Sequence, residues 1–105
     1  MGLMQRRKGA RVEREIVNLL KEAGLKAQRV PLSGAARGGF SGDIVFEGLK
    51  AEVKSRRSGF ALFYRWIGEC NVLFLKRNND PPLVVMTWDQ FIKLMQERHH
   101  DPKDA

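Results

Sequence analysis

The chain has 105 residues, which is enough for one compact domain with a single core. Its composition is that of a globular protein, with 43% hydrophobic and 30% charged residues, and 19 Lys and Arg against 12 Asp and Glu give a net charge of +7. One cysteine, Cys70, excludes an intrachain disulfide framework and a cysteine-based zinc site, and no apolar run approaches the roughly 18 residues of a membrane span.

The positive charge is concentrated towards the N-terminus. Residues 1–37 carry nine Lys and Arg against three Asp and Glu, whereas residues 61–105 carry six of each sign. An asymmetric basic surface on a small domain is typical of proteins that bind phosphates. We therefore expect a nucleic-acid partner that contacts the N-terminal half.

The first predicted element is a helix over residues 8–23, preceded by a basic tail over residues 1–7. Apolar residues recur there at helical spacing, and Gly24 follows as a stop signal. Three short strands are expected next, with a tight turn at Glu47-Gly48 joining the last two into a hairpin and a small-residue loop over 33–41. The predicted strands are 26–31, 43–46 and 49–54.

The second half predicts a short helix, two buried strands and a closing helix, with a frayed tail over 99–105. The ranges are 60–67, 71–76, 83–87 and 88–98. We interpret Cys70 as buried, and Tyr64, Trp66, Trp88 and Leu94 as core residues. The alternative for Tyr64 and Trp66, which flank Arg65, is a platform on which nucleic-acid bases stack. The order α-β-β-β-α-β-β-α predicts a single α/β domain over 1–105, with one mixed central sheet flanked by helices.

Acidic side chains are scarce in the basic half, so their positions are informative. A two-residue turn at Glu47-Gly48 places Asp43 opposite Glu52, and Lys54 shares the strand face of Glu52. Carboxylate oxygens bind Mg²⁺, and a lysine can steady water or phosphate charge, so this set suits phosphodiester hydrolysis. Glu13 is a candidate third carboxylate. The alternative interpretation is an ordinary solvent-facing strand with solvated helix charges.

In combination, these residues resemble the archaeal-type Holliday junction resolvases, which are small dimeric nucleases of the PD-(D/E)XK superfamily with a restriction-endonuclease-like fold. The resemblance covers residues 8–57, and Gly42 stands where the superfamily has proline. The matching segments are Lys8-Gly9, Glu13-Arg14-Glu15, Arg29, Ser33-Gly34, Gly42-Asp43-Ile44 and Glu52-Val53-Lys54.

The resemblance implies a role for each matched residue. Glu13, Asp43, Glu52 and the backbone carbonyl of Val53 are the expected ligands of Mg²⁺, for which Mn²⁺ is expected to substitute. Lys54 is expected to assist the attacking water. Arg14 and Ser33 are further catalytic candidates, and their alternatives are a plain surface cation and a turn residue.

The implied activity is that of a metal-dependent endonuclease acting on four-way junction DNA in recombination or phage DNA processing. We expect a homodimer, because the junction is approximately two-fold symmetric, in the cytoplasm of a bacterial, archaeal or phage-infected cell, on nucleoid DNA. No membrane partner is expected. The expected phosphate-binding residues are Arg6, Arg7, Lys8, Arg11, Arg14, Arg29, Arg37, Arg56 and Arg57.

Three alternatives remain open at this point. The same residues would serve a less selective nuclease that cuts flaps, branches or plain duplex, or a non-catalytic DNA-binding protein with a nuclease-like fold. An RNA-binding module is less favoured, because the aromatic residues lie mostly in the charge-neutral half. His99 and His100 are interpreted as solvated tail residues rather than as a metal pair.

Overall fold

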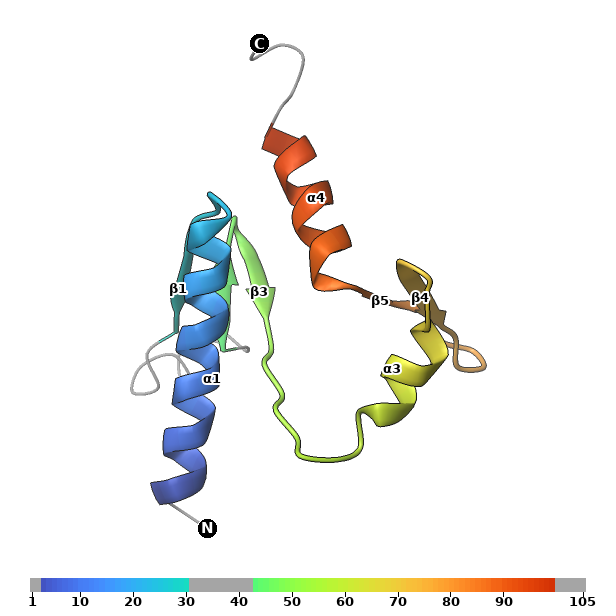
Figure 1. Ribbon diagram of the computed structural model, residues 1–105, viewed down its shortest axis with the longest axis horizontal. Helices are drawn as coiled ribbons and strands as arrows, with labels where there is room; N and C mark the ends of the chain where they lie inside the picture. The colour runs from blue at the N-terminus through green and yellow to red at the C-terminus, as the bar shows by residue number, and fades with distance from the viewer. Residues whose placement is uncertain (1–2, 31–42, 100–105) are drawn as a thin grey trace. The chain divides into compact units, whose positions relative to one another are not determined.

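The computed structural model describes residues 3–30 and 43–99, with the backbone alone for 3–8 and 99. Its elements follow the predicted order of helix, three strands, helix, two strands and helix (Figure 1). The chain divides into two compact units, Met1–Ser55 and Arg56–Ala105. None of the helices described is both long and apolar enough to cross a membrane.

The first unit packs one helix against a three-stranded antiparallel sheet of order β1-β2-β3. Its core consists of four buried residues: Val17 and Leu20 on the helix, Leu25 after it, and Ile44 in the central strand. Ile44 is fully buried, so the start of β2 is the most enclosed point described in this unit. The elements are α1 (Leu3–Glu22), β1 (Ala27–Arg29), β2 (Ile44–Phe46) and β3 (Leu49–Ala51).

The helix α1 begins at Leu3, so the prediction that residues 1–7 form a tail is wrong for residues 3–7. Arg, Lys, Gln, Met and Leu are strong helix formers, and the single glycine at position 9 costs only about 1 kcal/mol. The spacing of the apolar residues predicts which face of the helix is buried. The helix extends beyond those residues towards the N-terminus because residues 3–7 have high helix propensity.

The turn at Glu47-Gly48 is confirmed. Both residues have positive φ, 49° and 81°, as a type I′ turn requires. The resulting register pairs Phe46 with Leu49 and Ile44 with Ala51. The strands are shorter than predicted, and their pairing ends at Ile44 and Ala51, one residue short of Asp43 and Glu52.

The second unit contains α3 (Ala61–Ile67), the antiparallel pair β4 (Val72–Leu75) and β5 (Leu83–Met86), and α4 (Trp88–His99). Gly68 has a positive φ of 51° and ends α3, where its N–H is bonded to the carbonyl of Tyr64. Ile67 and Met95 are the buried hydrophobic residues described in this unit.

Several burial predictions for the second unit are wrong. Cys70 is exposed, and the two strands are not buried, since Phe74, Leu83 and Val84 are more than half exposed. Tyr64, Trp66, Trp88 and Leu94 are likewise exposed rather than in a core. An apolar run predicts a strand, but its burial depends on what covers it, and a unit of this size encloses only a small core.

The α/β class with flanking helices is confirmed and is consistent with a restriction-endonuclease-like fold. Each strand pair among the described residues is antiparallel, and the strands form a three-stranded and a two-stranded sheet instead of the one mixed sheet that the element order predicts. Short connections join β2 to β3 and β4 to β5, and such connections permit antiparallel pairing only, since a parallel pair needs a crossover of a dozen or more residues.

Candidate functional site

The open end of the hairpin fixes the side chain of Asp43. The N–H of Val53 donates to Oδ2 of Asp43 at 2.7 Å, and the N–H of Asp43 donates to the carbonyl of Ala51 at 2.7 Å. On its other side, the carbonyl of Asp43 accepts from the N–H of Val30 at 3.0 Å. The carboxylate is therefore held, partly buried, against the backbone of the segment that carries Glu52 and Lys54.

Glu52 and Lys54 lie on the same side of the chain as it leaves β3. Their side chains form an ion pair of 3.1 Å between Nζ and Oε2, with about half of each side chain exposed. Exposure alternates through this segment, with Glu52 and Lys54 exposed and Ala51 and Val53 partly covered. This alternation is that of an extended chain, so the shared face of Glu52 and Lys54 is as predicted.

Glu13 is held by Arg29. The guanidinium Nε donates to Oε1 of Glu13 at 3.0 Å, and the side chains are only 30% and 18% exposed respectively. Arg29 pairs with Ile44 across β1 and β2, one residue from Asp43. The contact ties the middle of α1 to the strand beside the candidate site.

The predicted catalytic residues are therefore joined in separate contacts and not in one cluster. Among the described residues, no three His, Cys, Asp or Glu side chains are grouped so as to hold a metal ion. The chemistry of the donors nevertheless fits a hard divalent cation, because Glu13, Asp43 and Glu52 supply carboxylate oxygens and Val53 a carbonyl. Two of the three carboxylates, those of Glu13 and Glu52, have cationic partners.

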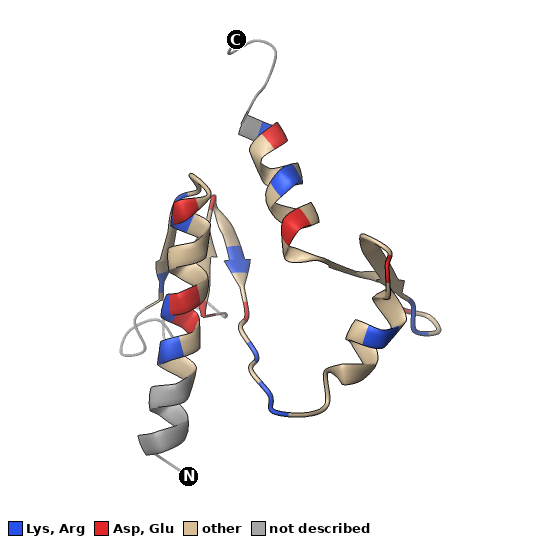
Figure 2. Ribbon diagram, in the orientation of Figure 1, with Lys and Arg blue, Asp and Glu red and all other residues tan. Residues whose placement is uncertain are grey.

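The predicted phosphate-binding residues that are described lie on α1, on β1 and on the segment after β3. Arg11 and Arg14 are exposed on α1, and Arg56 and Arg57 are exposed beyond Lys54. Figure 2 shows basic residues recurring along the segment that leaves β3, and both charge signs mixed on α1. For Arg6, Arg7 and Lys8 the backbone alone is described, and Ser33 and Arg37 lie outside the described residues.

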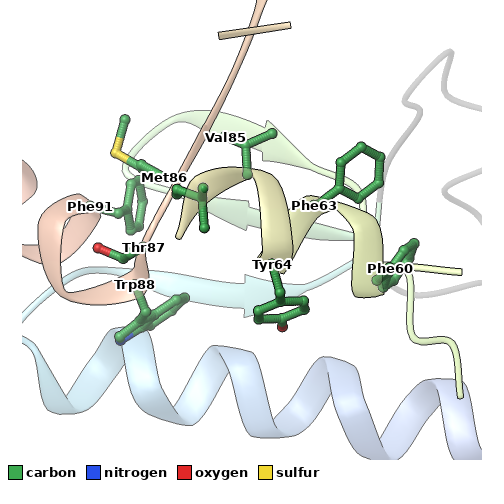
Figure 3. A pocket seen from close by; sticks show the side chains of 9 residues that line it. Phe60, Phe63, Tyr64, Val85, Met86, Thr87, Trp88 and Phe91 are labelled. Carbon is green, nitrogen blue, oxygen red and sulfur yellow. The ribbon is translucent and has the colours of Figure 1, made fainter. Parts of the chain in front are cut away.

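The second unit contains an apolar groove of about 670 Å³. Side chains of α3 line one part of it, and the end of β5 with the start of α4 lines the rest (Figure 3). Its aromatic lining includes Phe63, Tyr64 and Trp88, and the Tyr64 side chain is largely exposed. No candidate catalytic carboxylate lines this groove.

Glu13 and Arg29 are separate candidates in the sequence, and only the structure shows that they are partners. The two residues are 16 positions apart, so neither helical nor strand spacing relates them. The signal that was available is chemical: a carboxylate on the sheet-facing side of a helix needs a cation or a donor when it is partly buried. At Val53 the resemblance implies a role for the carbonyl, whereas the structure shows that the N–H of the same residue holds Asp43.

Comparison with known proteins identifies the family of the chain. Residues 4–62, more than half of the chain, match the family described as Archaeal Holliday junction resolvase (Hjc). Searches of curated proteins and of solved structures found no match. The matched region contains α1, the hairpin, and the segment with Glu52 and Lys54. On these grounds the chain belongs to the archaeal Holliday junction resolvase family of nucleases, within the PD-(D/E)XK superfamily.

Proposed function

We propose that this chain is a divalent-metal-dependent endonuclease that nicks four-way junction DNA in recombination or phage DNA processing. In this proposal Glu13, Asp43, Glu52 and the carbonyl of Val53 bind the metal, which is Mg²⁺ or Mn²⁺. Lys54 orients the attacking water, and Arg14 and Ser33 contact the phosphate that is cut.

The observation that carries the proposal is the hydrogen bond from the N–H of Val53 to Asp43. It fixes a carboxylate on one side of the hairpin against the peptide that links Glu52 to Lys54 on the other side. Oxygen donors from two neighbouring chain segments thereby share one end of the sheet, where phosphate can approach from solvent. A carboxylate serving only as a solvated surface charge would not need this backbone anchor.

The metal ligands, Lys54 and the exposed arginines have different roles in the proposed reaction. When bound, a divalent cation supplies charge neutralisation at the phosphate and lowers the pKa of a coordinated water. Lys54 is half exposed, so its ammonium can reach both water and a phosphate oxygen. The exposed arginines at 11, 14, 56 and 57 bind flanking phosphates and set the position of the backbone.

We further propose that two copies act on one junction, each cutting one of two opposed strands. The support is the two-fold symmetry of the substrate and the apolar groove on the second unit, because a monomer rarely exposes a large apolar surface. Sedimentation of the purified protein, alone and with junction DNA, measures the copy number directly. A single copy on the junction would contradict this part of the proposal.

The test of the activity is a cleavage assay on labelled four-way junction, flap and linear duplex, each with Mg²⁺ or with EDTA. We expect paired nicks in the junction with Mg²⁺, and none with EDTA. Glu52→Gln and Lys54→Gln should each abolish the nicks. Glu22→Gln and Lys21→Gln are the matched controls, because both residues are exposed at the end of α1 in the same unit, and they should cut like the parent protein.

The remaining outcomes separate the alternatives. Cutting of all three DNAs, lost in the Glu52 and Lys54 variants, would keep the site and replace junction selectivity with general nuclease activity. Junction binding without cutting under any metal condition would contradict the catalytic proposal and leave a DNA-binding protein. If the control variants lose as much cutting as the Glu52 and Lys54 variants, the loss reflects a general effect of charge and not a catalytic site.

A further inference from the structure

The Glu13–Arg29 contact is the most enclosed ion pair at the candidate site. Its side chains are 18% and 30% exposed, whereas those of the Glu52–Lys54 pair are 52% and 58% exposed. Arg29 uses Nε for a 3.0 Å hydrogen bond, so the contact is directional as well as electrostatic. A carboxylate held in this way presents less of its charge to any other ligand.

This contact conflicts with metal binding by Glu13. A divalent cation on the carboxylate would bring two positive groups onto the same oxygens, and repulsion at such distances is strong where water is partly excluded. Arginine is suited to leave one anion for another, because its planar fork matches a carboxylate and a phosphate equally well. The guanidinium therefore has an alternative partner when DNA is present.

We propose that Arg29 is an exchangeable counterion, which holds Glu13 while no metal is bound and transfers to a DNA phosphate when metal binds. The inference rests on the proposed metal site. The exchange couples the two ligands, since metal frees Arg29 for DNA and DNA removes Arg29 from Glu13.

The coupling predicts opposite effects of one substitution on two affinities. Arg29→Gln removes the competing cation, so the DNA-free protein should bind Mn²⁺ about three- to tenfold more tightly, the range expected for losing a partly buried ion pair. The same variant should bind junction DNA more weakly in Ca²⁺, because one phosphate contact is lost. Titration calorimetry measures the first affinity, and a gel-shift titration measures the second.

Arg77→Gln is the matched control. Arg77 also pairs with a carboxylate, that of Asp80, but in the second unit, so the variant makes the same change of net charge without altering a partner of a proposed metal ligand. It should leave Mn²⁺ affinity unchanged. If Arg29→Gln fails to fold, Arg29→Lys keeps the positive charge and loses the fork, and it should tighten Mn²⁺ binding by a smaller factor.

Mn²⁺ affinities of the parent protein and its variants distinguish an error in the counterion exchange from an error in the proposed metal site. If Glu52→Gln abolishes Mn²⁺ binding but Arg29→Gln leaves it unchanged or weaker, the metal site stands and the counterion exchange is wrong. Equal tightening in Arg77→Gln would reduce the effect to net charge and also overturn the inference. If the parent protein binds no Mn²⁺ at all, the proposed metal site is wrong and the inference falls with it.

Discussion

Asp43 has an observed structural contact and a proposed role as a metal ligand, and a substitution can separate the two. Its carboxylate accepts the N–H of Val53 and so closes the open end of the hairpin, where backbone pairing between β2 and β3 stops. The same carboxylate is a proposed metal ligand. An amide at this position keeps an acceptor oxygen for the backbone but loses the charge that a divalent cation needs.

Asp43→Asn is therefore expected to retain the fold and lose the metal. We expect its free energy of unfolding to stay within about 0.5 kcal/mol of the parent value, while Asp43→Ala, which leaves the Val53 N–H without its acceptor, loses about 1–3 kcal/mol. Urea denaturation gives both stabilities, and calorimetry with Mn²⁺ gives the binding. Unchanged Mn²⁺ affinity in Asp43→Asn would remove Asp43 from the metal site.

At the scale of elements, two glycines of the first unit, Gly9 and Gly48, differ in their backbone conformation. Gly9 lies inside α1, where its backbone is helical, and Gly48 lies in the hairpin turn with a φ of 81°. A Cβ added at either position would meet no atom within 4 Å, so packing does not distinguish the two sites. Backbone conformation alone should decide the sign of a substitution.

Gly9→Ala should stabilise the protein by about 0.5–1 kcal/mol, because alanine loses less conformational entropy in a helix. Gly48→Ala should destabilise it by about 1–2 kcal/mol, because an L side chain is strained at that φ. Both values come from urea denaturation of the two variants beside the parent protein. If Gly9→Ala destabilises the protein, a group outside the described residues must approach the backbone at Gly9 too closely to leave room for a methyl group.

At the scale of the whole molecule, the sequence predicted local structure well and long-range partners poorly. The hairpin register follows from two turn residues, and the buried stripe of α1 follows from its period, so both could be deduced locally. The start of α1 at Leu3 depends on propensity without periodicity. The burial of β4 and β5 depends on what covers them, which no local pattern encodes.

At the candidate site too, contacts between residues close in sequence could be predicted and contacts between distant residues could not. Glu52 and Lys54 are two residues apart on an extended chain, and their ion pair follows from that spacing. Glu13 and Arg29 come together only because α1 packs against β1, so their contact required the fold. The loop over 33–41, with Ser33 and Arg37, lies outside the described residues, and its predicted roles stay predictions.

The distribution of charge over the whole chain makes a final prediction about DNA binding. Phosphate contacts release condensed counterions, so the logarithm of junction affinity should fall steeply and linearly with the logarithm of salt concentration. Removing one phosphate contact should reduce that slope by about one. Arg57 is exposed in the basic segment after Lys54, whereas Arg98 is exposed on α4 in the charge-neutral half.

Arg57→Gln should therefore lower the salt slope and weaken binding to all DNA sequences alike, while Arg98→Gln should change neither. Gel-shift titrations at several salt concentrations in Ca²⁺ measure both slopes on the same junction. Because the two variants have the same net charge, a difference between them reports where phosphate lies on the protein and not how much charge the protein carries. Equal slopes would place the DNA elsewhere than beside the segment that follows β3.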